Sequence, residues 1–275
     1  MSVRAGWSST VAPNSSVSMT WPTAGWLSTR WRAHPADVAP ALYIEGVAKR
    51  LLLLLAVLAV VGVCAGPWFY RTQMEGLPAP VLSLPTTRPA STNLDGKWVV
   101  SAGPDDEAKR TQAGYRARQK LLWETVIVTG RTNSVRGDAT VAGGNLQAAS
   151  FVVDVGTMQS AHRGRDDKFR STDVMDAAQF PTAKLAVLDP VNLSAVSGDG
   201  TPTTLEVSAQ LTLKGVSRQV AVRLEVQRSG SGVVAVGQIP VTFADYGIAP
   251  PPPPAGLLAV DPIVTIEFLV NLVKR

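Results

Sequence analysis

Apolar and polar residues alternate one by one along several stretches of the second half of the chain. In 205–213 the apolar positions are Leu205, Val207, Ala209, Leu211 and Leu213, and polar residues stand between them. Because successive side chains of a β-strand point to opposite faces, this pattern predicts a strand with one buried and one solvated face. The same period in 220–226, after a turn at 214–216, predicts an antiparallel hairpin.

Further stretches with period two complete a predicted sheet. The segments 151–155 and 264–272 alternate clearly, and 97–101, 114–129, 134–142, 182–188 and 232–243 do so more weakly. No long amphipathic helix separates them, which excludes parallel βαβ units. We therefore predict an all-β fold for residues 94–275, a closed antiparallel β-barrel of about eight strands. Closure is favoured over a sandwich because it removes exposed sheet edges.

An unbroken apolar run precedes this domain, LLLLLAVLAVVGVCAGPWFY at 51–70. Twenty helical residues span roughly 30 Å, the hydrocarbon thickness of a bilayer, so a single transmembrane helix is predicted over 47–71. Basic residues are more frequent before the run than after it, which places the N-terminus in the cytoplasm and the C-terminal domain outside the cell membrane. A cleaved signal peptide is the alternative, since Val63-Cys64-Ala65 is similar to a small-residue cleavage site.

Two segments flank the predicted helix. Residues 1–46 form a low-complexity N-terminal segment rich in Ser, Thr, Trp, Ala and Pro. This segment is either a cytoplasmic interaction region or the product of a start codon assigned too far upstream. Residues 72–93 contain four prolines among Ser and Thr, which predicts a Pro-rich linker acting as a semi-rigid spacer.

Composition and motifs argue against several classes of function. The net charge is +5, but Lys and Arg are scattered, so nucleic-acid binding is not expected. One cysteine and two histidines leave too few ligands for a Cys- or His-based metal site, and no metal or cofactor is expected. No GxSxG elbow, Gly-rich phosphate loop or HExxH motif occurs in the predicted barrel, so we do not expect an enzyme.

The densest polar cluster is HRGRDDKFRSTD at 162–173. Asp166 and Asp167 are adjacent, and on extended chain their side chains point to opposite faces, which makes them a poor acid–base pair. We interpret Arg165 and Asp166 as a structural polar cluster, in a loop held by Arg–carboxylate hydrogen bonds.

An apolar interior is the remaining candidate site. An eight-stranded barrel is just wide enough to be filled by its side chains or to hold one small or elongated ligand. Periodicity alone supports the two cases equally. The candidate lumen residues are the inward-facing apolar positions Phe151, Val153, Val155, Leu205, Val207, Ala209, Leu211, Val222, Leu224, Ile266 and Phe268.

Several motifs in order resemble the YceI-like family. They are the "VVDV" strand, Ser160, Arg165-Asp166, Phe180-Pro181, the hairpin "LTLKGVSR", Asp245-Tyr246-Gly247-Ile248 and the terminal "VTIEFLVNL", over about 94–273. Many members carry a His-Ser pair in an early strand, where this chain has Gly114-Tyr115-Arg116.

The resemblance implies a polyisoprenoid-binding, lipocalin-like barrel. The chain would then be a carrier or sensor of a long-chain isoprenoid or another amphiphilic lipid at the outer face of the membrane, with the apolar tail in the lumen. Two alternatives stay open. One is a structural or protein-interaction domain with a filled core, and the other is a lipid-acting enzyme whose polar cluster would be the Arg165-Asp166 region.

Overall fold

The computed structural model describes residues 39–70, 78–86, 88–121, 124–249 and 258–275. Helix α1 spans Ala39–Tyr70. Within the described residues, no helix combines the length and the hydropathy that crossing a bilayer requires. The membrane anchor at 47–71 and its orientation therefore stay predictions, and residues 1–38 of the predicted N-terminal segment lie outside the described residues.

Twelve β-strands form the sheet of the C-terminal domain. Their bounds are β1 Gly96–Ser101, β2 Gln112–Leu121, β3 Glu124–Thr132, β4 Val135–Ala142, β5 Asn145–Asp154, β6 Gln159–Ser160, β7 Thr182–Val187, β8 Val191–Asn192, β9 Thr203–Leu213, β10 Val216–Ser229, β11 Gly232–Thr242 and β12 Leu258–Lys274. The described part of the domain also contains the short helices η2 Val155–Thr157, α2 Arg163–Arg170 and η3 Phe243–Tyr246.

Eight of these strands close into an antiparallel barrel. The ring runs β1-β4-β5-β7-β9-β10-β11-β12 and closes through pairing of β12 with β1. The prediction of a closed antiparallel barrel of about eight strands is confirmed. Its clearest strand, β9, buries Val207, Ala209, Leu211 and Leu213 as the alternation predicted. The predicted hairpin turns through Lys214 and Gly215, both with positive φ, a conformation that glycine adopts without strain.

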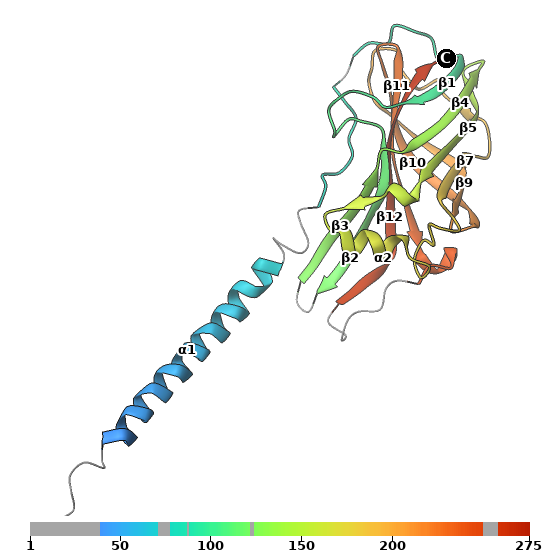
Figure 1. Cartoon of the computed structure of the whole chain (residues 1–275). Helices are drawn as coiled ribbons and strands as arrows, with labels where there is room; N and C mark the ends of the chain where they lie inside the picture. Colours follow the sequence, from blue (N-terminus) through green and yellow to red (C-terminus); the bar gives the residue numbers. More distant parts are fainter. Residues whose placement is uncertain (1–38, 71–77, 87, 122–123, 250–257) are drawn as a thin grey trace, which may run out of the picture. The chain divides into compact units, whose positions relative to one another are not determined.

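The long strand β12 pairs with a different strand at each end of the barrel. Its last residues pair with β1, whereas residues 258–269 pair with β2. Strands β2 and β3 form a hairpin where one strand was predicted over 114–129, and β6 pairs only with β3. Figure 1 shows β1 at one end of the barrel and β2, β3 and α2 at the other. The connection from β5 to β7, which contains β6 and α2, belongs to this second end.

The chain before β1 packs on the outside of the barrel. We call residues 78–86 the docked segment. Leu82 is buried against Val234, Val236 and Leu269 on the outer face of β11 and β12. The backbone N–H of Ala79 donates to the hydroxyl of Thr129 on β3 at 3.0 Å. Part of the predicted Pro-rich linker therefore packs against the barrel.

The docked segment also covers a buried charge. Glu267 on β12 is 0% exposed and accepts hydrogen bonds from Arg116 at 3.1 Å and Arg131 at 2.6 Å. Both guanidinium groups also donate to backbone carbonyl oxygens of the docked segment, those of Ala79 and Pro80. Glu267 stands at a polar position of the alternating stretch 264–272 and is nevertheless buried, because two arginines and the docked segment enclose its carboxylate.

Candidate functional site: two cavities in the barrel

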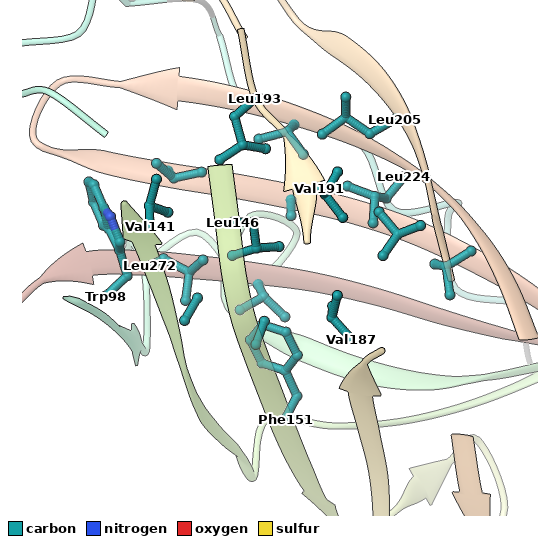
Figure 2. Close-up of a pocket in the computed structure, with 18 of the residues that line it drawn as sticks. Trp98, Val141, Leu146, Phe151, Val187, Val191, Leu193, Leu205, Leu224 and Leu272 are labelled. Atoms are coloured by element: carbon teal, nitrogen blue, oxygen red, sulfur yellow. The ribbon is translucent and has the colours of Figure 1, made fainter. Parts of the chain in front are cut away.

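The smaller cavity lies at the β1 end and is entirely apolar. Its volume is about 110 Å³. Side chains from β1, β4, β5 and β7–β12 surround it, as Figure 2 shows for Trp98, Leu146, Leu205 and Leu224 among others. Trp98 is 2% exposed, and its indole N–H donates to the carbonyl of Leu94 at 2.7 Å. The one polar atom of this side chain is thereby satisfied, which leaves an apolar wall.

The larger cavity lies at the end formed by β2, β3 and α2, and its volume is about 590 Å³. This is within the range of pockets that enclose small-molecule ligands. Its walls are apolar where the strands line it. The polar lining includes His162, Arg165 and Lys168 at α2, and Tyr115 and Gln119 on β2. The cavity is therefore amphipathic, with an apolar barrel wall and a polar rim.

All eleven candidate lumen residues line these cavities. The smaller cavity is lined by Leu205, Val207, Ala209, Val222 and Leu224, the larger by Val153, Val155, Leu211 and Ile266, and both by Phe151 and Phe268. Leu185 and Val270 also border both, so the two spaces are neighbours along the barrel. The barrel interior is not completely filled by its side chains. The part of these residues in ligand binding stays a prediction.

Three lumen aromatics lie opposite glycines on neighbouring strands. The register pairs Tyr115 with Gly130, Phe151 with Gly137 and Phe268 with Gly237. A Cβ atom added to any of these glycines would overlap with the facing ring. Each ring therefore lies over its glycine, in the space that a side chain at that position would fill. The ring stays against the barrel wall, which leaves the lumen open. Glycine inside a strand marks such close approaches, but the sequence does not show which ring lies opposite.

Helix α2 carries the polar cluster and is anchored to the barrel wall. Asp166 is 8% exposed, and its carboxylate accepts a hydrogen bond from the backbone N–H of Ser160 at 2.8 Å. Residues 163–170 form this helix rather than the expected loop. The Arg–carboxylate pair joins Arg170 to Asp167 at 2.9 Å, because helical residues three apart lie on one face. The side chains of Arg165 and Asp166 instead point in different directions. Arg165 lines the larger cavity, and Asp166 points to β6.

Tyr115 and Phe169 form an aromatic pair where α2 meets β2. Their ring centroids are 5.1 Å apart and the rings are stacked. Burial raises the pKa of the Tyr115 hydroxyl to about 12, with Arg165 lowering this pKa and Asp166 raising it. Tyr115 thus forms part of the cavity wall.

Two polar atoms near the larger cavity have no hydrogen-bond partner. They are Nε2 of His162 and the hydroxyl of Tyr246, both belonging to residues that line the cavity. Burial, reinforced by Arg165, lowers the pKa of His162. Such groups are rare in folded proteins unless a ligand or water satisfies them. Among the described residues, no three His, Cys, Asp or Glu side chains gather as a metal site would require.

A comparison with protein families decides where this domain belongs. The YceI-like domain matches residues 107–272, more than half of the chain. The chain belongs to the YceI-like family. A UPF0312 protein of Vibrio vulnificus (strain YJ016) is 32% identical over 157 residues, which cover 54% of this chain and 76% of that protein. A UPF0312 protein of Vibrio cholerae serotype O1 (strain M66-2) is 32% identical over 133 residues, covering 44% and 65%.

Among solved structures, the YceI-like barrel is similar to a polyisoprenoid binding domain from Saccharophagus degradans implicated in plant cell wall breakdown. The TM-score is 0.50 at 20% identity, over 65% of this chain and 98% of that one. At this identity the likeness shows the fold alone. The family match begins at residue 107, so strand β1 and the docked segment lie outside it.

Proposed function

We propose that this YceI-like domain binds the tail of a long-chain isoprenoid, or of another amphiphilic lipid, inside its barrel. The observation that carries the proposal is the pair of neighbouring cavities, one wholly apolar and one apolar with a polar rim. Each CH₂ group removed from water contributes about 0.8 kcal/mol, so an apolar tail binds such walls without specific polar contacts. The polyisoprenoid-binding protein of similar fold supports the same ligand class.

The proposed role is that of a carrier or sensor rather than of an enzyme. The described cavity lining contains no acid–base pair of carboxylates, and Asp166, next to Arg165, accepts a hydrogen bond from a backbone N–H. A carrier needs an apolar space and a polar rim, and the larger cavity has both.

We also propose that the barrel works at the outer face of the cell membrane, as part of a single-pass protein. The support comes from the sequence: an apolar run at 51–70 follows Lys49 and Arg50, and the interfacial aromatic residues Trp68, Phe69 and Tyr70 end it. In this arrangement the membrane that anchors the domain is also a source of its ligand.

The test compares two tryptophan substitutions on β9. Ala209 is 1% exposed and lines the smaller cavity, whereas its neighbour Gln210 is exposed on the other face. Ala209→Trp should fill the space of a lipid tail, and Gln210→Trp should place the same ring in solvent. The full chain and both variants are purified in one detergent, and lipids in their organic extracts are quantified by mass spectrometry.

We expect Ala209→Trp to retain less bound lipid than the wild type, and Gln210→Trp to retain the same amount. Thermal melts run in parallel show whether each variant is folded. Equal lipid content in the two folded variants would refute binding in the barrel.

A further inference from the structure

The charged groups on the wall of the larger cavity are of one sign. Arg165, Lys168 and Lys184 border it, and no aspartate or glutamate does so among the described residues. Lys184 is exposed and lies between the inward-facing Ala183 and Leu185 of β7, so its ammonium group points away from the lumen. Arg165 and Lys168 of α2 are therefore the cations at the rim, and they lie three residues apart, on one face of the helix.

These two cations differ in how far they are neutralised. Lys168 forms an ion pair with Asp173 at 2.5 Å. Arg165 makes no hydrogen bond or ion pair with any described side chain. The nearest carboxylate in sequence, that of Asp166, accepts the N–H of Ser160 and does not line the cavity. The guanidinium of Arg165 is half-buried, and with no side-chain acceptor among the described residues its five N–H donors are available to a ligand.

A second polar group at the same rim also lacks a partner. His162 precedes α2, and its Nε2 is buried without a hydrogen bond although the ring as a whole is half-exposed. Beneath these polar groups, the stacked rings of Tyr115 and Phe169 begin the apolar wall. The cavity thus has polar groups at α2, with Arg165 and His162 Nε2 lacking a partner, and apolar side chains along the strands, the order of groups in an amphiphile with an anionic head.

We propose that the rim at α2 is a head-group site that selects an amphiphile ending in a phosphate or pyrophosphate, with Arg165 as its main anchor. This inference rests on the proposed function, which supplies the tail site. A planar guanidinium can donate to two phosphate oxygens at once, and the opposite charges strengthen both hydrogen bonds. A neutral alcohol or phenol carries no negative charge and offers a single oxygen. Lys168, which is already paired with Asp173, contributes less, and His162 adds a ring nitrogen without a partner beside the head group.

The experiment uses the full chain in a nonionic detergent and three ligands: farnesyl pyrophosphate, farnesol and inorganic pyrophosphate. The first two share one isoprenoid tail and differ in the head group, and the third is a head group without a tail. Isothermal titration calorimetry gives their affinities for the wild type, Arg165→Gln and Arg163→Gln. Arg163 is the matched control, since it is exposed on the same helix, does not line the cavity and loses the same charge.

We expect farnesyl pyrophosphate to bind the wild type about tenfold to a hundredfold more tightly than farnesol, as charge-assisted hydrogen bonds allow. Arg165→Gln should remove most of this preference, whereas Arg163→Gln should keep it. Inorganic pyrophosphate should bind far more weakly than the farnesyl ester, because it lacks the tail.

The outcomes separate the two proposals. If farnesol and farnesyl pyrophosphate bind equally, the head-group site is refuted and the tail site stands. Loss of preference to the same degree in both variants would mean that net charge, not a site at Arg165, is responsible. Inorganic pyrophosphate binding as tightly as the ester would overturn the lipid assignment in favour of a free anion. If neither prenyl ligand binds, the proposed function itself fails.

Discussion

Helix α2, at the rim of the larger cavity, is held in place by a few contacts of single residues. Asp166 ties α2 to β6 through one hydrogen bond to Ser160, and Arg170 donates to the carbonyl of Met158 at 3.0 Å. Phe169, between them, stacks on Tyr115. The helix thus presents Arg165 to the cavity from a fixed base, although its own eight residues are too few for a helix that is stable in isolation.

The titration of Tyr115 tests this local packing. Its pKa is raised from 10 to about 12 because burial disfavours the phenolate. Between pH 10 and 12 the unfolded chain loses this proton while the folded protein keeps it, so stability is lost as the pH rises. We expect the free energy of unfolding of the wild type to fall more steeply over this interval than that of Tyr115→Phe, by about 2–3 kcal/mol in total. Urea denaturation at pH 9 to 12 measures the difference, and parallel curves would show that the hydroxyl is not buried.

At the scale of strands, pairs of a ring and a glycine keep the lumen open. Phe268 on β12 lies opposite Gly237 on β11 at the border between the two cavities. Tyr115 with Gly130, and Phe151 with Gly137, repeat the arrangement on other strands. Each pair places a large apolar surface on the wall while using the space that a second side chain would have taken.

Gly237→Ala should therefore push the ring of Phe268 into the lumen. We expect a loss of stability of about 1–3 kcal/mol from overpacking and a lower content of bound lipid. The double variant Gly237→Ala with Phe268→Leu removes the overlap and should recover both quantities. Denaturant unfolding and lipid extraction on the same samples test this, and a double variant no better than Gly237→Ala would contradict the mechanism.

The docked segment gives a second prediction at this scale. Leu82 is 6% exposed in its contact with β11 and β12, whereas the neighbouring Val81 is 59% exposed. Leu82→Ala should lower the free energy of unfolding by about 2–3 kcal/mol and make residues 78–86 sensitive to limited proteolysis. Val81→Ala should change stability by less than about 0.5 kcal/mol. If both variants behave like the wild type, the segment is a free linker.

For the whole molecule, the proposal joins a lipid-binding barrel to a membrane through one apolar helix. The orientation follows from the excess of Lys and Arg before residue 51, since Lys49 and Arg50 precede the run directly and only Arg71 and Arg88 follow it closely. A basic flank is retained on the cytoplasmic side during insertion. The barrel then reaches its ligand at the opposite face.

A reporter enzyme that is active only outside the cytoplasm should therefore be active when fused after Arg275. The same reporter fused before residue 47 should be inactive, because that end is expected inside. A fluorescent reporter that matures only in the cytoplasm serves as the reciprocal measurement. Activity of the C-terminal fusion in the cytoplasm would disprove both the orientation and the proposed place of action.

Sequence alone determined the barrel, its main strands and the residues that face its interior. These properties follow from the two-residue period of a β-strand. In 205–213 the apolar side chains all point to one face and the polar side chains to the other, so burying the apolar face assigns every residue to the inside or the outside. The same rule failed where tertiary contacts cover the outer face. Glu267 occupies a polar position of β12 and is nevertheless 0% exposed, because Arg116, Arg131 and the docked segment enclose it.

Only the tertiary structure decided whether the barrel is filled and what lies at its rim. Cavity volume depends on which ring faces which glycine across two strands. A shift of the register by two residues would keep the alternation of each strand and still change these pairs. The surroundings of Arg165 also depended on folding, because Asp166, its expected partner, accepts the N–H of Ser160 instead. Local periodicity specifies which face a side chain takes, whereas its partner across the barrel is set by packing between segments distant in sequence.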